Sequence, residues 1–309
     1  MIVKDEIARR YLELFREEIA TGKTHANTPW LDLDTEAYRA YGRGERDALP
    51  GPRYTDGAVI RLMMKNALGK TVLCLAGGGG QQSAVFSLLG AKVTVFDLTP
   101  EQLESDRRAA AHYGYTVETV QGDMRDLSAL PSAHFDRVYQ PISTLFIPDL
   151  RELYRGVARV TRPGGLYCSQ YAVPLLLMAE KMPWDGKAYT LRITQPYVRG
   201  AILETEGGKM NFAEGRSFSE FHHLLSDIIN GHVTEGLAIC GVWENPRPDA
   251  GPALEKLEPG SEEHRERFLP MGLTVVARRE DPDRDKAAGG DAGKRGNSRR
   301  ASRRGGGAG

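Results

Sequence analysis

The chain has 309 residues, of which 40% are hydrophobic and 27% are charged, and its 41 basic side chains balance 41 acidic ones. This apolar content suffices for a large core, which excludes wholesale disorder, and zero net charge argues against a protein that coats nucleic acid. We expect no secretory signal in the charged segment 1–10 and no membrane span, because the longest apolar stretch covers only residues 172–179. Three well-separated cysteines indicate neither a metal site nor disulfides, so we expect a cytoplasmic protein with reduced thiols.

Strand and helix patterns alternate along most of the chain. Apolar side chains recur every three or four residues from Ile7 to Ile19, which predicts a helix within an N-terminal cap over residues 1–60. Helices are predicted over residues 81–89, 100–113 and 149–160. Short apolar or β-branched runs predict strands over residues 71–76, 92–97, 116–121, 135–140 and 166–172. The alternation predicts an α/β fold with a Rossmann-like, doubly wound, mostly parallel sheet.

Cap and turn signals place the remaining elements. The pairs with capping-box spacing are Thr99 and Gln102, Asp149 and Glu152, and Ser217 and Glu220. An apolar stripe from Phe218 to Ile228 predicts a helix behind the last pair, and two closing strands are expected over 237–242 and 273–277. The main domain is therefore expected over 61–280, with an insertion near 174–216. Residues 281–309 lack aromatic, Leu, Ile and Val side chains and carry eight basic and four acidic ones, which predicts a disordered basic tail.

The segment Val72 to Ser83, VLCLAGGGGQQS, predicts a strand, a turn of four glycines and a helix. Glycines allow a backbone to approach a ligand closely, and a helix N-terminus offers unpaired N–H groups. Asp97 ends the next strand 17 residues after Gly80, where a carboxylate can accept both hydroxyls of a ribose. Asp123 follows the third strand at the same predicted edge of the sheet, where its carboxylate can accept a hydrogen bond from the exocyclic amine of adenine. The alternatives are a merely flexible turn and carboxylates that only cap or turn the chain.

The turn does not by itself identify the nucleotide. A dinucleotide site favours G-x-G-x-x-G, but the frame from Gly78 places Ser83 where the third glycine belongs. The sequence therefore leaves open an NAD(P)-dependent oxidoreductase or a non-catalytic nucleotide-binding protein.

Segments 72–80, 122–124, 135–136 and 162–165, together with Asp97, resemble the class I S-adenosylmethionine (SAM)-dependent methyltransferases over residues 68–172. The stretches LCLAGGGGQQS, GRGERDALP and VQGDMRDLS are similar to a bacterial subgroup of this family. The resemblance implies a seven-stranded sheet closed by a C-terminal antiparallel hairpin, and SAM as the cofactor. The cofactor-binding residues it implies are Ala76, Gly77, Gly78, Gly80, Asp97, Leu98, Asp123, Met124 and Gln140. Cys74 and Ala76 depart from the family, which often has an acid and a glycine there.

The residues expected to contact the methyl acceptor come from three places. They are Tyr139, Gln140, Pro141 and Ser143 after the fourth strand, Trp184, Tyr189 and Tyr197 in the insertion, and His222 and His223. Each also has a purely structural reading, and no catalytic residue or metal ligand is assigned. The strand-four edge lacks the motif of amine-directed nucleic-acid methyltransferases, so we expect a small-molecule acceptor, with the tail offering at most a weak contact to nucleic acid.

Overall fold

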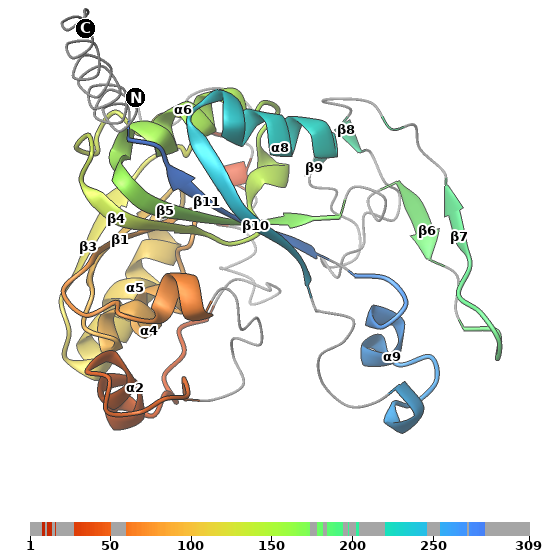
Figure 1. Cartoon of the computed structure of the whole chain (residues 1–309), viewed down its shortest axis with the longest axis horizontal. Helices are drawn as coiled ribbons and strands as arrows, with labels where there is room; N and C mark the ends of the chain where they lie inside the picture. The colour runs from red at the N-terminus through yellow and green to blue at the C-terminus, as the bar shows by residue number, and fades with distance from the viewer. Residues whose placement is uncertain are drawn as a thin grey trace, which may run out of the picture.

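The computed structural model describes residues 8–9, 11–13, 16, 28–50, 60–173, 178–181, 184–193, 197, 202–203, 220–245, 254–270 and 272–281. A seven-stranded sheet with strand order β10-β11-β5-β4-β1-β2-β3 forms its centre (Figure 1). Its strands are β1 (Thr71–Leu75), β2 (Lys92–Asp97), β3 (Val117–Gln121), β4 (Phe135–Gln140), β5 (Thr161–Ala172), β10 (Leu237–Asn245) and β11 (Gly272–Arg279). Strands β3, β2, β1, β4 and β5 are parallel, whereas β11 pairs antiparallel with both β5 and β10. The predicted Rossmann-like sheet with its closing hairpin is therefore confirmed.

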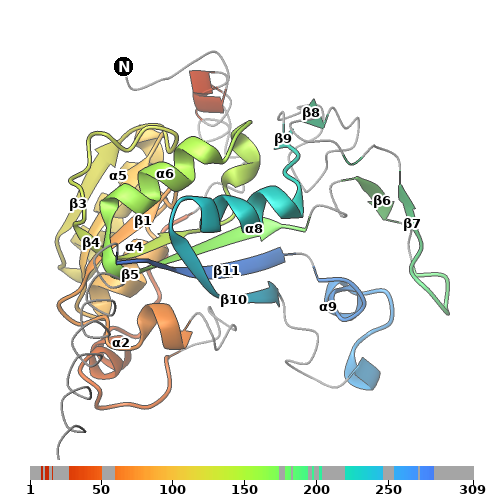
Figure 2. The ribbon, with the colours of Figure 1, turned by 45° about the horizontal axis from the view of Figure 1, so that its top comes forward.

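Helices cover both faces of the sheet, as Figures 1 and 2 show. One face carries α2 (Thr35–Gly42), α4 (Gln82–Leu88) and α5 (Pro100–Tyr113), and the other carries α6 (Arg151–Val160) and α8 (Leu225–Thr234). Short helical turns are η1 (Ile60–Met64), η2 (Thr144–Phe146), η3 (Leu254–Lys256) and α9 (Glu262–Glu266). Two small pairs of strands complete the structure: β6 (Ala179–Lys181) with β7 (Leu191–Ile193), and β8 (Ile202–Leu203) with β9 (Glu220–Phe221).

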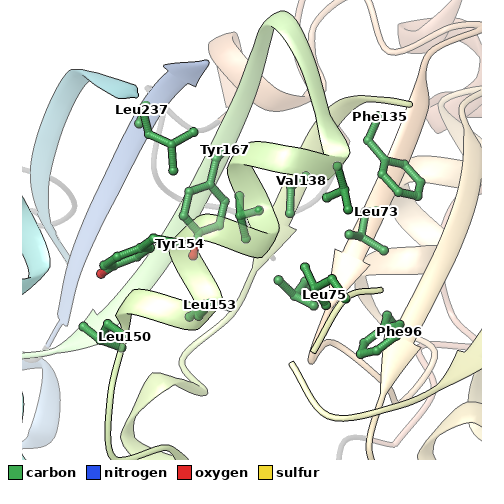
Figure 3. Close-up of a cluster of buried hydrophobic side chains, with 14 of the residues drawn as sticks. Leu73, Leu75, Phe96, Phe135, Val138, Leu150, Leu153, Tyr154, Tyr167 and Leu237 are labelled. Carbon is green, nitrogen blue, oxygen red and sulfur yellow. The ribbon is translucent and has the colours of Figure 1, made fainter. Parts of the chain in front are cut away.

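Alternation along β1 divides the core into two layers. Leu73 and Leu75 join Phe135, Tyr154 and Tyr167 in the cluster under α6 and α8 (Figure 3). Val72 and Cys74 point to the opposite cluster under α4 and α5. Successive side chains on a strand point to opposite faces, so an almost wholly apolar strand indicates a sheet buried on both sides. Packing on both faces holds the parallel strands in place, and their carboxyl ends therefore meet at one edge of the sheet.

Most predicted boundaries are close to the observed ones. Strands β2 and β4 have the predicted bounds, and β1 and β3 each differ by one residue at one end. Strand β5 begins at Thr161 rather than at the predicted residue 166, because residues 162–165 form an irregularity within the strand, between the pairs Phe135–Thr161 and Arg137–Leu166. Helix α5 ends at Tyr113, and its C-cap residue Gly114 has a φ of 71°, in the left-handed region that glycine tolerates.

The capping predictions were mostly wrong. Glu220 does not cap a helix but pairs in β9, and α8 begins only at Leu225; Ser217 and Phe218 lie outside the described residues. Thr99 is the N-cap residue of α5, but its side chain makes no capping bond, so no capping box forms with Gln102. The N-cap residue of α6 is Leu150, although the carboxylate of Asp149 accepts a hydrogen bond from the backbone N–H of Arg151.

Three further expectations concern segments that lie partly or wholly outside the described residues. Ala8, Tyr11 and Leu12 are buried helical residues of the expected N-terminal helix, whose remaining apolar positions lie outside the described residues. The tail beyond Asp281 and much of the expected insertion also lie outside them. Within the described part of the chain, no helix is both long enough and apolar enough to cross a membrane, and no group of three or more His, Cys, Asp or Glu side chains is arranged to hold a metal.

Candidate active site

A cavity of about 420 Å³ runs along the carboxyl edge of the parallel strands. Ligands of open α/β sheets bind at this edge, and the volume is in the usual range of small-molecule sites. Its described wall consists of Ala8, Tyr11, Ala76, Gly78, Gln82, Phe96, Asp97, Leu98, Thr99, Gln102, Gly122, Asp123, Met124, Arg125, Pro141, Ile142, Ser143, Phe146, Ile147 and Gln170. The cavity thus extends from the end of β3, across β2 and β1, to the ends of β4 and β5.

The glycine turn is tightly packed against α5 and the end of β2. A Cβ on Gly78 would lie 2.7 Å from the Cβ of Gln102 and 2.9 Å from Oδ2 of Asp97. Gly80 has a φ of +74°, and a Cβ there would lie 2.6 Å from the carbonyl oxygen of Ser105. Gly80 and Gly77 do not line the cavity, and the close contact at Gly80 shows that this glycine packs the turn against α5.

Asp97 connects the turn to the second strand. Its Oδ2 accepts a hydrogen bond from the N–H of Gly78 at 2.9 Å, and its Oδ1 accepts one from the N–H of Thr99 at 2.9 Å. Burial raises the pKa of this carboxyl, and the backbone donors at Thr99 and Gly78 oppose that shift. The hydroxyl of Thr99 and the N–H of Leu98 also favour the ionised form of Asp97, and the carboxylate lines the cavity, where a ribose hydroxyl can approach it.

Asp106, which the sequence analysis missed, holds the turn from behind. Its carboxylate accepts hydrogen bonds from the N–H groups of Gly79 and Gly80, both at 3.0 Å, and from the hydroxyl of Ser83. Burial raises its pKa from the ordinary 3.8 to about 6, against the opposing effect of these donors. The available signal was a carboxylate on the apolar side of α5, beside Leu103 and Ala110.

The carboxylate expected to meet adenine already has a partner. Asp123 forms a buried ion pair with Arg125, whose Nε lies 3.0 Å from Oδ1 and whose Nη2 lies 2.5 Å from Oδ2. The N–H of Arg125 also donates to Oδ1 at 2.9 Å. Both residues line the cavity, so an amine at this position would share the carboxylate with Arg125.

Gln140 lies behind the cavity wall rather than in it. It is fully buried, and its Nε2 donates to Oγ of Ser143 at 2.9 Å and to the sulfur of Met124 at 3.4 Å. Its Oε1 accepts a hydrogen bond from the hydroxyl of Tyr167. Gln140 therefore positions two residues that do line the cavity.

The end of the cavity near β4 is apolar and aromatic. The rings of Tyr11 and Phe146 meet edge to face, with their centroids 5.1 Å apart. Ile142 and Ile147 line the same end, together with Pro141 and Ser143 from the predicted candidates. The N-terminal segment thus contributes part of this wall, although it is distant from β4 in the sequence.

The other acceptor candidates lie elsewhere. Trp184 and Tyr189 pack with His264 and Phe268 beside α9, and Tyr139 packs against Phe86 in the core. His222 packs against Tyr197, and Nε2 of His223 lies 2.9 Å from the carbonyl oxygen of Thr144. These six candidates (Tyr139, Trp184, Tyr189, Tyr197, His222 and His223) are absent from the described wall of the cavity.

Comparison with known proteins identifies the family. Residues 73–169 match the model of a methyltransferase domain. The uncharacterized methyltransferase YbaJ of Bacillus subtilis (strain 168) is 32% identical over 177 residues, which are 57% of this chain and 69% of YbaJ. The chain belongs to the class I SAM-dependent methyltransferases. Its methyl donor is accordingly SAM.

Two further similarities bear on this methyltransferase. A ubiquinone biosynthesis O-methyltransferase of Xanthomonas axonopodis pv. citri is 33% identical over 97 residues, but these span only 31% of this chain and 41% of that relative. The crystal structure of a SAM-dependent methyltransferase from Mesorhizobium loti superposes with a TM-score of 0.57 at 23% identity, covering 74% of this chain and 99% of that one. The superposition shows that these two chains share a fold.

Proposed function

We propose that this methyltransferase transfers the methyl group of SAM to a small, largely apolar acceptor. One observation carries the proposal: a single cavity joins the polar ends of β1, β2 and β3 to the apolar wall of Tyr11, Phe146, Ile142 and Ile147. Among the described lining residues, every carboxylate and guanidinium lies at the ends of β2 and β3. The end near β4 is thus suited to an uncharged acceptor.

The residues present fit the cofactor. Gly78 and Asp97 line the cavity side by side, joined by the hydrogen bond from the Gly78 N–H, and a carboxylate there offers acceptor oxygens to a ribose hydroxyl. In this arrangement Asp97 and Leu98 hold the ribose, Asp123 and Met124 hold adenine, and Ala76 with Gly78 meets the methionine moiety. The bound cofactor supplies an electrophilic methyl group on a sulfonium.

The chain itself then contributes by aligning the acceptor with the methyl group and by excluding water from the cavity. The Tyr11 and Phe146 rings line the cavity at the end where the methyl group is expected, and this apolar wall can position an uncharged acceptor. The hydroxyl of Ser143 is oriented, because it accepts from Gln140 and donates to the carbonyl oxygen of Pro141. It provides one fixed polar contact for the acceptor.

Two considerations support a small-molecule acceptor. Residues 1–280 carry 33 basic and 37 acidic side chains, which does not suit a surface that follows a phosphate backbone. The Xanthomonas relative is named for the biosynthesis of ubiquinone, a small molecule. We accordingly assign residues 1–60 to a cap, residues 61–280 to the catalytic domain with an insertion near 174–216, and residues 281–309 to a basic tail outside the reaction.

The test uses SAM labelled in the methyl group and a cell extract divided by ultrafiltration. The full chain and a truncation lacking residues 281–309 should both transfer label to the small-molecule fraction at similar rates, and Asp97→Ala should transfer little. Transfer of label to protein or RNA in the retained fraction would contradict a small-molecule acceptor, most clearly if the truncation abolished it.

A further inference from the structure

Two buried glutamines line the cavity, and among the described residues the side-chain oxygen of each is an unpaired acceptor. Gln82 is 8% exposed, Gln102 is 7% exposed, and both line the cavity. In the described part of the chain, the side-chain oxygen Oε1 of each is buried and accepts no hydrogen bond. Buried polar atoms are nearly always paired, and an unpaired one is costly. Two such atoms beside one cavity therefore indicate donors supplied by a ligand.

The fold places these amides on both sides of the glycine turn. Gln82 is the first residue of α4, directly after the turn that ends β1. Gln102 lies in the first turn of α5, beside Asp97, and its Cβ faces Gly78. Strands β1 and β2 are neighbours, so Asp97, Gln102 and Gln82 line the same cavity at one edge of the sheet.

The nearby carboxylates are already engaged. Asp106 accepts hydrogen bonds from the turn, Asp123 pairs with Arg125, and Asp97 is the expected ribose acceptor. Cys74 is a fully buried thiol, and burial keeps its pKa well above the ordinary value, so it offers no anion. An ammonium group above the turn consequently needs another acceptor.

We infer that Oε1 of Gln82 accepts a hydrogen bond from the α-ammonium of SAM and that Oε1 of Gln102 accepts one from a ribose hydroxyl. This inference rests on the proposed cofactor placement. An uncharged amide costs less to bury than a carboxylate, and it still provides the acceptor that the ammonium requires.

Two ligands separate the two roles. S-adenosylhomocysteine carries both the amino-acid moiety and the ribose, whereas 5′-methylthioadenosine lacks the amino-acid moiety. Calorimetry should show that Gln82→Leu weakens S-adenosylhomocysteine at least about 10-fold, as expected for a bond to a charged group, and leaves methylthioadenosine within about twofold. Gln102→Leu should weaken both ligands by about 3- to 10-fold.

Gln81 offers a matched control. It precedes Gln82, does not line the cavity, and its Nε2 donates to the carbonyl oxygen of Thr28 at 3.1 Å. Gln81→Leu should leave the affinity for both ligands within about twofold. Gln82→Glu keeps the acceptor and adds a negative charge, so it should bind S-adenosylhomocysteine at least as tightly as the parent protein.

Each outcome decides a separate claim. Three results would overturn the roles assigned to the two glutamines. The first is an equal loss of affinity for both ligands in Gln82→Leu, and the second is no loss of affinity in Gln82→Leu or in Gln102→Leu. The third is a collapse of the affinity for S-adenosylhomocysteine in Gln82→Glu. If the parent protein bound neither ligand, the cofactor placement itself would fail. Thermal unfolding without ligand checks folding: Gln82→Leu removes an unpaired buried acceptor, so its midpoint should not fall below that of Gln81→Leu.

Discussion

The two ends of the cavity are built in different ways. The cofactor end consists of backbone turns and carboxylates that directly follow β1, β2 and β3, so its parts are close to the strands that position them. The apolar end near β4 brings Tyr11, Phe146 and Gln170 together from distant parts of the chain. The residues of the cofactor end can therefore be predicted from the local sequence, whereas those of the apolar end are found only in the folded structure.

The largest expected effect concerns the packing of the glycine turn. Gly80→Ala combines a φ of +74° with a Cβ placed 2.6 Å from the carbonyl oxygen of Ser105, and we expect a loss of about 2–5 kcal/mol in the free energy of unfolding. Gly164→Ala has a similar φ of +77° but nothing within 4 Å, so it should lose only about 1–2 kcal/mol. Equal losses in urea denaturation would show that close packing does not constrain the turn.

Asp106 makes the cofactor end sensitive to pH. Its pKa is about 6 in the folded chain against an ordinary 3.8, so the folded state favours the protonated form. The carboxyl's contribution to stability is complete below about pH 4 and is lost as the pH rises through 6.

Comparison with Asp106→Asn isolates this contribution. The unfolding free energy of the parent protein minus that of the variant should fall by about 2 kcal/mol between pH 4 and pH 7. Other groups titrate in both proteins and cancel in the difference. A difference that stayed flat or rose over this range would contradict the assigned direction of the shift.

A pair of cavity variants separates the two ends directly. Asp97→Ala removes a charged acceptor, so S-adenosylhomocysteine should bind about 10- to 150-fold more weakly, equivalent to about 1.5–3 kcal/mol. Ile142→Ala changes the opposite wall and should leave that affinity within about threefold while it lowers the rate of methyl transfer. Calorimetry checks both variants, and a loss of less than threefold in Asp97→Ala would leave this carboxylate with a structural role only.

The smallest effect concerns Ala76, which has a φ of +46° in the region that favours glycine. Ala76→Gly should raise the free energy of unfolding by about 0.5–1 kcal/mol and, because it opens the turn beside the cavity, strengthen S-adenosylhomocysteine binding a few-fold. Ala133→Gly relieves a similar φ of +48° in an exposed loop. It should give the same stability gain and no change in affinity; matching affinity gains would argue against a specific effect of Ala76.

The sequence predicted features that depend on neighbouring residues. Short runs of strand-forming residues located β2 and β4 at their observed bounds. The capping box at Glu220 failed because a non-local partner, Ile202–Leu203, draws Glu220 and Phe221 into a strand pair. Propensity cannot reveal such a partner, since the pairing depends on distant parts of the chain.

The candidate site, like the fold, was predictable where it depends on residues next to the strand ends. Ala76, Gly78, Asp97, Leu98, Asp123 and Met124 all line the cavity, because each lies within a few residues of a strand end. Gln140 follows the same pattern but is directed into the network with Tyr167 and Ser143. The ion pair of Asp123 with Arg125 and the contact of Tyr11 with Phe146 were not predictable, since both depend on side-chain packing.

A crystal structure of the protein with S-adenosylhomocysteine tests the central claim most directly. We predict adenine beside Asp123 and Met124, the ribose hydroxyls within hydrogen-bond distance of Asp97, and the sulfur directed toward the Tyr11 and Phe146 rings. Adenine between those rings with the amino acid at Asp123, or a ligand bound outside the cavity, would contradict the placement of the cofactor and, with it, of the acceptor.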